Sequence, residues 1–348
     1  MVFAVCVALA AHFSSLRNLP MSLLPLAPLR AVLFAACWLA SSAALAVSID
    51  KVDLPRPEGV RHYLLAQPDR SASGKRPLVI LLHGHGGNAA QLLGQRFGAA
   101  PLAQWLTIAE RENLLLAAPD GIKGADGHPG WNDCRADADN NPAGNDTALI
   151  GAIIDREIAE HGADPARVYV MGMSNGGMMT FRLASEIGSR LAAFAAVSAS
   201  MAQRSACPQP AQPLAALLVA GTADPLVPYA GGEVHFLSRK SRGSVLGIEQ
   251  VAAFWRRRNG LSGEPVVTPL PHRDPADPTR ATRLLWGADS AAPQVELMRI
   301  EQGGHIEPSI AQRARRAYLT LVGPQNGDFE VAEEAWRFFR DKRAALRQ

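Results

Sequence analysis

The sequence predicts an α/β fold in which helices cover both faces of a mostly parallel central sheet. Short, wholly apolar runs such as Pro77–Leu82 and Leu114–Pro119 alternate with segments of helical periodicity such as Thr147–His161. Runs without polar alternation are typical of strands buried on both faces of a parallel sheet. Functional residues of such a sheet lie beyond the carboxyl ends of its strands. Catalytic or binding residues are therefore expected directly after each apolar run.

The expected elements follow one another in that alternation. The strands are Val60–Ala66, Pro77–Leu82, Leu114–Pro119, Arg167–Met171, Phe194–Val197, Leu214–Ala220 and Val295–Ile300. The helices are Pro101–Arg111, Thr147–His161, Gly176–Ile187, Ile248–Arg258 and one that follows Asp328. Asp146 and Asp328 stand where N-caps of the second and the last helix are expected.

The first 46 residues predict a secretory signal. They contain no Asp, Glu or Lys, and within them Arg30 precedes a short apolar run that closes on Ala44-Leu-Ala46. This pattern favours export to the periplasm or the medium with cleavage after Ala46, and translation starting at Met21. An uncleaved anchor is the alternative, although a membrane span needs about 20 apolar residues. Cys37 also leaves a lipoprotein form open.

The remaining residues, 47–348, are expected to form one catalytic domain. Removing 46 of the 348 residues leaves 302, a length that suits a single α/β domain. The formal charge of +3 falls to +1 because two arginines leave with the signal. The sequence has no stripe of basic residues, so a nucleic-acid partner is not expected. A stable membrane span is not expected either, once the signal is removed. The sequence does not predict an oligomeric state.

Two cysteines remain after signal removal, Cys134 and Cys207. In an exported protein such a pair favours one disulfide, with two separate thiols as the alternative.

Ser174 is the candidate nucleophile. It lies in Gly172-Met-Ser-Asn-Gly176, directly after the strand Arg167–Met171 and directly before a helix. A strand-serine-helix turn forces unusual backbone angles on the serine, and its neighbours must be small, which the two glycines satisfy. An ordinary glycine-rich loop is the alternative.

An oxyanion site is expected at an earlier strand end, where His83-Gly-His-Gly-Gly-Asn88 follows Leu82. Backbone N–H groups in such a loop can stabilise a developing negative oxygen. The expected donors are the amides of His85 and Asn175, the latter at a helix start where the dipole favours an anion. A dinucleotide site is excluded by the glycine spacing. A metal role for His83 and His85 is the remaining alternative, without an evident carboxylate ligand.

The expected acid and base follow later strands. Asp224 comes just beyond Leu214–Ala220 and could orient an imidazole, or it could only cap a turn before Pro225. His305 follows Val295–Ile300 through two glycines and is the preferred base over His235 and His272. The order Ser174, Asp224, His305 is the order of the α/β hydrolases.

One acidic loop raises the question of calcium. It contains Asp133, Asp137, Asp139, Asn141 and Asp146. The EF-hand pattern fails because Pro142 and Ala148 replace the required glycine and glutamate. A solvated loop is therefore expected, with calcium as the alternative.

With these motifs the chain resembles the secreted polyhydroxybutyrate depolymerase, feruloyl esterase and acetylxylan esterase group of α/β hydrolases. The resemblance spans about Pro77 to Arg340. It rests on Leu82-His-Gly-His-Gly-Gly87, Gly130-Trp-Asn132 with Cys134, Gly172-Met-Ser-Asn-Gly-Gly177, Gly221-Thr-Ala-Asp-Pro225 with Val227-Pro-Tyr229, and Gly303-Gly-His305. It implies a triad of Ser174, Asp224 and His305. The chain departs from the family at Glu307, where tryptophan is common, and at Cys134, which lacks a neighbouring cysteine.

The expected function is therefore hydrolysis of a carboxylic ester through an acyl-enzyme, without a cofactor. The resemblance implies a polyester or plant cell-wall ester as substrate. A serine peptidase on the same fold is the alternative, and a non-catalytic polysaccharide-binding module is a remote one.

Overall fold

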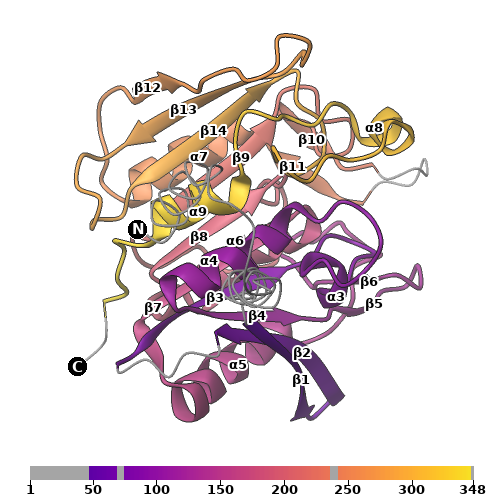
Figure 1. The fold of residues 1–348 in the computed structure, drawn as a ribbon, viewed down its shortest axis with the longest axis vertical. Helices are drawn as coiled ribbons and strands as arrows, with labels where there is room; N and C mark the ends of the chain where they lie inside the picture. The colour runs from indigo at the N-terminus through magenta and orange to yellow at the C-terminus, as the bar shows by residue number, and fades with distance from the viewer. Residues whose placement is uncertain (1–46, 69–73, 236–241, 346–348) are drawn as a thin grey trace, which may run out of the picture. The chain divides into compact units, whose positions relative to one another are not determined.

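The computed structural model describes residues 47–68, 74–235 and 242–345. In these residues a ten-stranded sheet forms the centre of the fold (Figure 1). The predicted signal segment, 1–46, lies outside the described residues. The strand order is β1-β2-β4-β3-β7-β8-β9-β14-β13-β12. The strands are β1 (Val47–Arg56), β2 (Gly59–Pro68), β3 (Arg76–Leu82), β4 (Leu115–Pro119), β7 (Ala163–Met173), β8 (Ala193–Val197), β9 (Ala215–Gly221), β12 (Val266–Pro269), β13 (Arg280–Trp286) and β14 (Val295–Glu301). Two small sheets pair β5 (Ile122–Lys123) with β6 (Pro129–Gly130), and β10 (Gly231–Glu233) with β11 (Ser244–Leu246).

The centre of the main sheet is parallel and its edges are antiparallel. Strands β4, β3, β7, β8, β9 and β14 pair in parallel with one another, whereas every pairing of β1, β2, β13 and β12 is antiparallel. This confirms the predicted α/β fold. The expectations missed β1, β12 and β13, because these strands at the two ends of the sheet contain polar or exposed positions and form no continuous apolar run.

Helices lie on both sides of the sheet (Figure 1). The longer ones are α4 (Gln104–Glu112), α5 (Asp146–His161), α6 (Asn175–Glu186), α7 (Ile248–Arg258) and α9 (Val331–Phe339). The shorter ones are α3 (Ala89–Leu92), α8 (Arg316–Val322), and the 3₁₀ turns η1 (Pro101–Ala103) and η2 (Gly188–Arg190). Among the described residues, no helix combines the length and the apolar character that crossing a bilayer demands.

Two apolar cores fill the space between the sheet and these helices. Strand β3 shows the alternation, since Leu78 and Ile80 join one core while Val79 and Leu81 join the other. The first core takes side chains from α5, α6 and α7, and the second from α4 and α9. Each fully buried large aliphatic or aromatic side chain contributes about 1.5–3 kcal/mol to the free energy of folding. These cores therefore hold the ends of the strands in fixed positions.

Two helix caps differ from expectation. The N-cap of α5 is Asn145, whose Oδ1 accepts from Ala148 N at 3.1 Å, and Asp146 is the first helical residue. The N-cap of α9 is Glu330, not Asp328. Both predicted caps were wrong because distant groups bind these aspartates: Arg61 donates to Asp146, and the backbone N–H of Arg273 donates to Asp328.

Candidate active site

Ser174 lies in the sharp turn between β7 and α6. Its φ of 55° and ψ of −122° place it in a region that residues other than glycine rarely adopt. The turn is held because Ser174 N donates to Val197 O on the neighbouring strand at 2.8 Å. A strained serine held by its surroundings at a strand end is the geometry that exposes a nucleophile.

The glycines beside Ser174 are required by close backbone contacts. A Cβ on Gly172 would lie 2.2 Å from the carbonyl oxygen of Gly176, and a Cβ on Gly176 would lie 2.3 Å from that of Leu82. Both distances are far inside van der Waals contact. The glycine pair therefore lets α6 begin directly against the end of β3, which brings the two strand-end loops together.

His305 and Asp224 meet beyond the ends of β14 and β9. The Nδ1 of His305 lies 2.7 Å from the Oδ2 of Asp224, and both side chains are buried. The loop is anchored by the backbone, since His305 N donates to Val322 O at 2.6 Å. A carboxylate at this position holds imidazole Nδ1–H and leaves Nε2 to exchange a proton.

Asp224 makes both kinds of contact that the sequence left open. Its Oδ1 accepts from the backbone N–H groups of Leu226 and Val227, each at 2.8 Å, as in a turn cap. Its Oδ2 binds His305. The turn thus fixes the carboxylate that faces the imidazole.

The other two candidate histidines have different surroundings. His235 lines the same pocket as Ser174, but it is half exposed and its nearest carboxylate, Glu233, lies 3.7 Å away. His272 pairs with Asp328 at 3.0 Å, and most residues of its loop, 271–278, are exposed.

A pocket of about 90 Å³ opens at the turn of Ser174. Ser174 and His305 both line it, together with His85 and Asn175. All four predicted residues are thus brought to one pocket, and Asp224 lies behind His305. A larger groove of about 620 Å³ adjoins it and shares Gly84, His85, Met173 and Tyr318.

The loop after β3 is arranged by its two histidines. His83 Nδ1 donates to Gly84 O at 2.7 Å, and its Nε2 accepts from Gly121 N at 2.9 Å, so both ring nitrogens are used by the backbone. Burial lowers the pKa of His83. Burial, and then the charge of Arg242, lower the pKa of His85 to about 4, so its ring is neutral at neutral pH.

The histidines His83 and His85 and the acidic loop were both considered as metal ligands. In residues 47–68, 74–235 and 242–345, no group of three or more His, Cys, Asp or Glu side chains is arranged to hold a metal ion.

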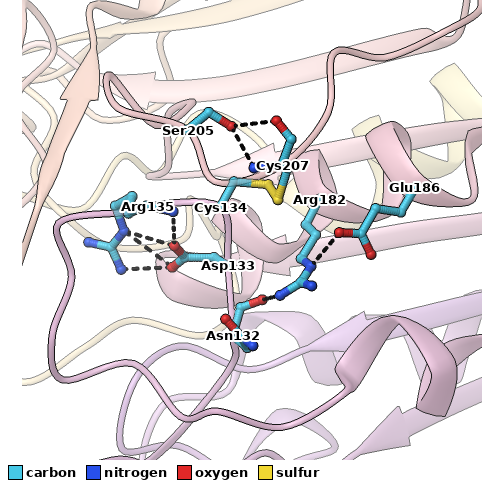
Figure 2. The surroundings of a disulfide bond; sticks show 8 residues. All are labelled: Asn132, Asp133, Cys134, Arg135, Arg182, Glu186, Ser205 and Cys207. Carbon is cyan, nitrogen blue, oxygen red and sulfur yellow. Dashed lines mark hydrogen bonds and ion pairs between the residues drawn. A yellow bond between two sulfur atoms is a disulfide. The ribbon is translucent and has the colours of Figure 1, made fainter.

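The acidic loop is largely internal, and the expectation of a solvated loop was wrong. Asp133 is buried and paired with Arg135, whose Nη2 donates at 2.7 Å (Figure 2). Asp146 is buried and accepts from Arg61 at 3.0 Å, while Asp137 accepts from the hydroxyl of Ser244 at 2.6 Å. Arg61 and Ser244 are far away in sequence, so no local pattern revealed these partners.

Cys134 and Cys207 are joined by a disulfide. It lies beside the Asp133–Arg135 pair and ties their loop to residues 204–207 (Figure 2). The sequence suggested this bridge from the cysteine count alone.

Sequence reasoning missed several residues that line the pocket, Arg135, Arg242 and Tyr318 among them. Arg135 neighbours Cys134, which was a weak signal. Arg242 reaches His85 across 157 residues, and Tyr318 lies on α8, so only the tertiary fold identifies them.

Comparisons with known proteins indicate relatives that hydrolyse esters. Residues 69–237 match the phospholipase/carboxylesterase family. The chain is 29% identical over 269 residues to NocK of Nocardia uniformis subsp. tsuyamanensis, a protein assigned as an esterase, covering 76% of this chain and 74% of that one. It is 33% identical over 128 residues to feruloyl esterase B of Neurospora crassa, covering 36% of this chain and only 38% of that relative.

A solved structure shows the same fold. Acetyl xylan esterase from Aspergillus awamori superposes with a TM-score of 0.53 at 13% identity, covering 84% of this chain and 99% of that one. The strand order and this superposition define an α/β-hydrolase fold. The chain is a carboxylic-ester hydrolase, and its residues 69–237 are similar to the phospholipase/carboxylesterase family.

Proposed function

We propose that the protein is an exported serine esterase whose triad is Ser174, His305 and Asp224. One observation carries this proposal: a serine in a strained strand-to-helix turn shares a small pocket with a histidine whose Nδ1 is bound by a buried aspartate. The three groups follow the ends of β7, β14 and β9, where functional residues of a parallel sheet are expected.

The proposed reaction begins when His305 Nε2 takes the proton of Ser174 Oγ and the oxygen attacks the ester carbonyl. The tetrahedral intermediate collapses, His305 returns the proton to the leaving alcohol, and an acyl-enzyme remains. Water, activated by the same imidazole, then releases the acid. Asp224 holds Nδ1–H throughout and stabilises the imidazolium.

The amides of His85 and Asn175 are the proposed oxyanion donors. Asn175 is the first residue of α6, and the first N–H groups of a helix have no partner within the helix. The helix dipole at this end also favours a negative oxygen. The loop that carries His85 packs against the same turn, since a Cβ on Gly84 would lie 3.4 Å from the Cβ of Ser174.

The groove beside the pocket supports an extended substrate, such as a polyester or a plant cell-wall ester. It offers about 620 Å³ next to a pocket of about 90 Å³. Phe97 lines it with 88% of its surface exposed, and the Arg315 guanidinium lies 4.6 Å from the centre of that ring. An aromatic platform at a groove suits a long or ring-bearing substrate. The names of the relatives, feruloyl esterase B and acetyl xylan esterase, point in the same direction.

Export to the periplasm or the medium is also part of the proposal. It is supported by the predicted signal with cleavage after Ala46 and by the Cys134–Cys207 bridge, since disulfides persist in oxidising compartments. Expression of the full chain followed by N-terminal sequencing of the exported protein tests it. A mature N-terminus at Val47 is expected, and retention of the whole chain in the cytoplasm would contradict it.

The ester hydrolase mechanism is tested with residues 47–348 and p-nitrophenyl acetate and butyrate. Ser174→Ala is expected to abolish turnover while leaving the melting temperature within a few degrees of wild type. Equal rates in both proteins would refute the assignment of Ser174.

The substrate class is tested with feruloyl esters, acetylated xylan and hydroxybutyrate oligomers. The Phe97→Ala variant is expected to lower kcat/KM for the preferred extended substrate by about tenfold, roughly the loss of one ring contact, with p-nitrophenyl acetate unaffected. An equal effect on both substrates would remove the groove from substrate binding.

A further inference from the structure

The side chain of Asn175 uses its whole amide in contacts with one neighbouring segment. Its Oδ1 accepts from Trp131 N at 2.7 Å, and its Nδ2 donates to Trp131 O at 3.1 Å and to Asp133 Oδ2 at 2.8 Å. The residue is 4% exposed. Because Asn175 is the first residue of α6 and directly follows Ser174, these bonds fix the backbone amide next to the nucleophile.

Asp133 is itself held on several sides. The Arg135 guanidinium donates to it from Nη2 at 2.7 Å and from Nε at 3.1 and 3.2 Å, and Arg135 N donates at 2.9 Å (Figure 2). Arg135 Nη1 in turn donates to Arg242 O. A carboxylate fixed by a planar guanidinium presents its remaining lone pairs in a set direction. Here one of them accepts from Asn175.

The same segment also touches the loop after β3. Trp131 Nε1 donates to His83 O at 2.8 Å, and Gly86 N donates to Pro129 O at 2.8 Å. These bonds flank His85 on both sides. Residues Pro129–Arg135, which we name the clamp segment, therefore bind both parts of the chain that carry the proposed oxyanion amides.

The far end of the clamp segment is tied down by the disulfide. Cys134 is bridged to Cys207, Ala206 N donates to Cys134 O at 2.8 Å, and Ala136 N donates to Arg204 O at 2.9 Å. Figure 2 shows the bridge next to the Asp133–Arg135 pair. The clamp segment thus has a covalent anchor outside the site and hydrogen bonds into it.

We propose that the clamp segment sets the geometry of the oxyanion site, with Trp131 and Asp133 as positioning residues that act through Asn175. The proposal rests on the proposed esterase function. Donor position matters because a misplacement of about 1 Å costs on the order of 100-fold in rate. Losing one oxyanion donor outright costs about 100- to 1000-fold.

A positioning role predicts a loss in kcat without a loss in substrate binding. Asn175→Ala keeps the backbone amide but removes all three side-chain bonds. It is expected to lower kcat about 10- to 100-fold with KM changed less than about twofold, since the interaction strengthens only in the transition state. The inhibition constant of a trifluoromethyl ketone, which binds serine as an oxyanion, is expected to rise by the same factor as kcat/KM falls.

Asn132→Ala is the matched control. Asn132 lies in the same segment, but its side chain donates to Gly144 O at 3.0 Å, away from Asn175. Its loss is expected to lower the melting temperature while leaving kcat and the ketone affinity within about twofold of wild type. If Asn175→Ala behaves like this control, its role is only structural and the proposal is overturned.

A second variant keeps the test decisive if Asn175→Ala does not fold. Asp133→Asn has nearly the same shape but loses the charge that Arg135 holds, and it is expected to lower kcat in the same direction. If Asn175→Ala does not fold, an Asp133→Asn protein that folds and keeps the wild-type kcat overturns the proposal. Where both single variants fold, the loss in the double variant should not exceed that of the larger single change, because both act through one contact. Fully additive losses would contradict the clamp.

These outcomes are distinct from a failure of the esterase proposal. If Ser174→Ala is as active as wild type, the proposed function falls. If Ser174→Ala is inactive while Asn175→Ala and Asp133→Asn keep full kcat and ketone affinity, only the clamp falls.

Discussion

Two aspartates near the pocket are buried, and a carboxylate oxygen of each lies at the same distance from a side-chain nitrogen of its partner. Asp224 lies 2.7 Å from His305 Nδ1, and Asp133 lies 2.7 Å from Arg135 Nη2. All four side chains are nearly inaccessible. The partners differ in one property: imidazole gains and loses a proton near neutral pH, whereas guanidinium stays charged. The first pair can therefore take part in proton transfer, and the second can only fix a position.

The comparison predicts opposite responses to the same kind of change. Removing the first carboxylate should affect the reaction and spare the fold. Removing the second should affect the fold, and the reaction only through the position of Asn175.

The largest effect is expected for Asp224→Asn. The new amide would donate to His305 Nδ1 and force the proton onto Nε2, so the imidazole could no longer accept from Ser174. We expect kcat to fall by about 10⁴-fold, as in other triads, with unfolding stability near that of wild type. Steady-state kinetics and urea unfolding of the same preparation measure both. A variant that keeps a tenth of the activity would remove Asp224 from the triad.

The next effect is expected for Asp133→Ala. It leaves the Arg135 cation buried without its carboxylate, which typically costs about 3–5 kcal/mol of unfolding free energy. Urea unfolding measures the loss. The double variant Asp133→Ala, Arg135→Met removes both charges and should recover most of it. A single variant as stable as wild type would show that the pair carries no buried charge.

A smaller effect is expected when Cys134 and Cys207 are both replaced by serine. The bridge closes a loop of 73 residues, and removal of such a crosslink costs about 2–4 kcal/mol. Thermal unfolding of the variant beside wild type, each without reductant, gives the difference. Identical unfolding curves would mean that the bridge does not restrain the unfolded chain.

The smallest effect concerns pH and His85. Its native pKa of about 4 lies below the ordinary 6.5, so between these values the unfolded state binds the extra proton. Stability present at neutral pH is therefore lost as the pH falls from 6.5 towards 4. For a partly exposed group we expect about 1 kcal/mol. His85→Gln should remove that part of the loss in unfolding experiments across this range, while His83 stays in both proteins. Parallel pH curves would contradict the assigned shift.

The contrast also explains what the sequence could predict. Ser174, Asp224 and His305, the proposed triad, come shortly after apolar strands and close to glycines, so the local sequence is enough to propose them. The parallel centre of the sheet was predicted for the same reason. Arg61 and Ser244 bind the acidic loop from positions far away in the chain, and the sequence therefore suggested solvation where the structure has buried pairs. The edge strand β12 was missed because its residues are exposed and it contains no long apolar run.

The proposed oxyanion site falls between these cases. His85 and Asn175 were predicted because their backbone positions follow from strand and helix ends. The side-chain contacts of Asn175 with Trp131 and Asp133 depend on a loop folded back from another part of the sheet. Residue types alone did not indicate them.

The most direct test of the central claim is the hydrolysis of p-nitrophenyl acetate by residues 47–348, wild type against Ser174→Ala. We predict turnover by the wild type and a loss of at least about 10⁴-fold in the variant, since a triad without its nucleophile keeps only residual catalysis. Circular dichroism should show both proteins equally folded. Turnover by the folded variant at the wild-type rate would contradict the account.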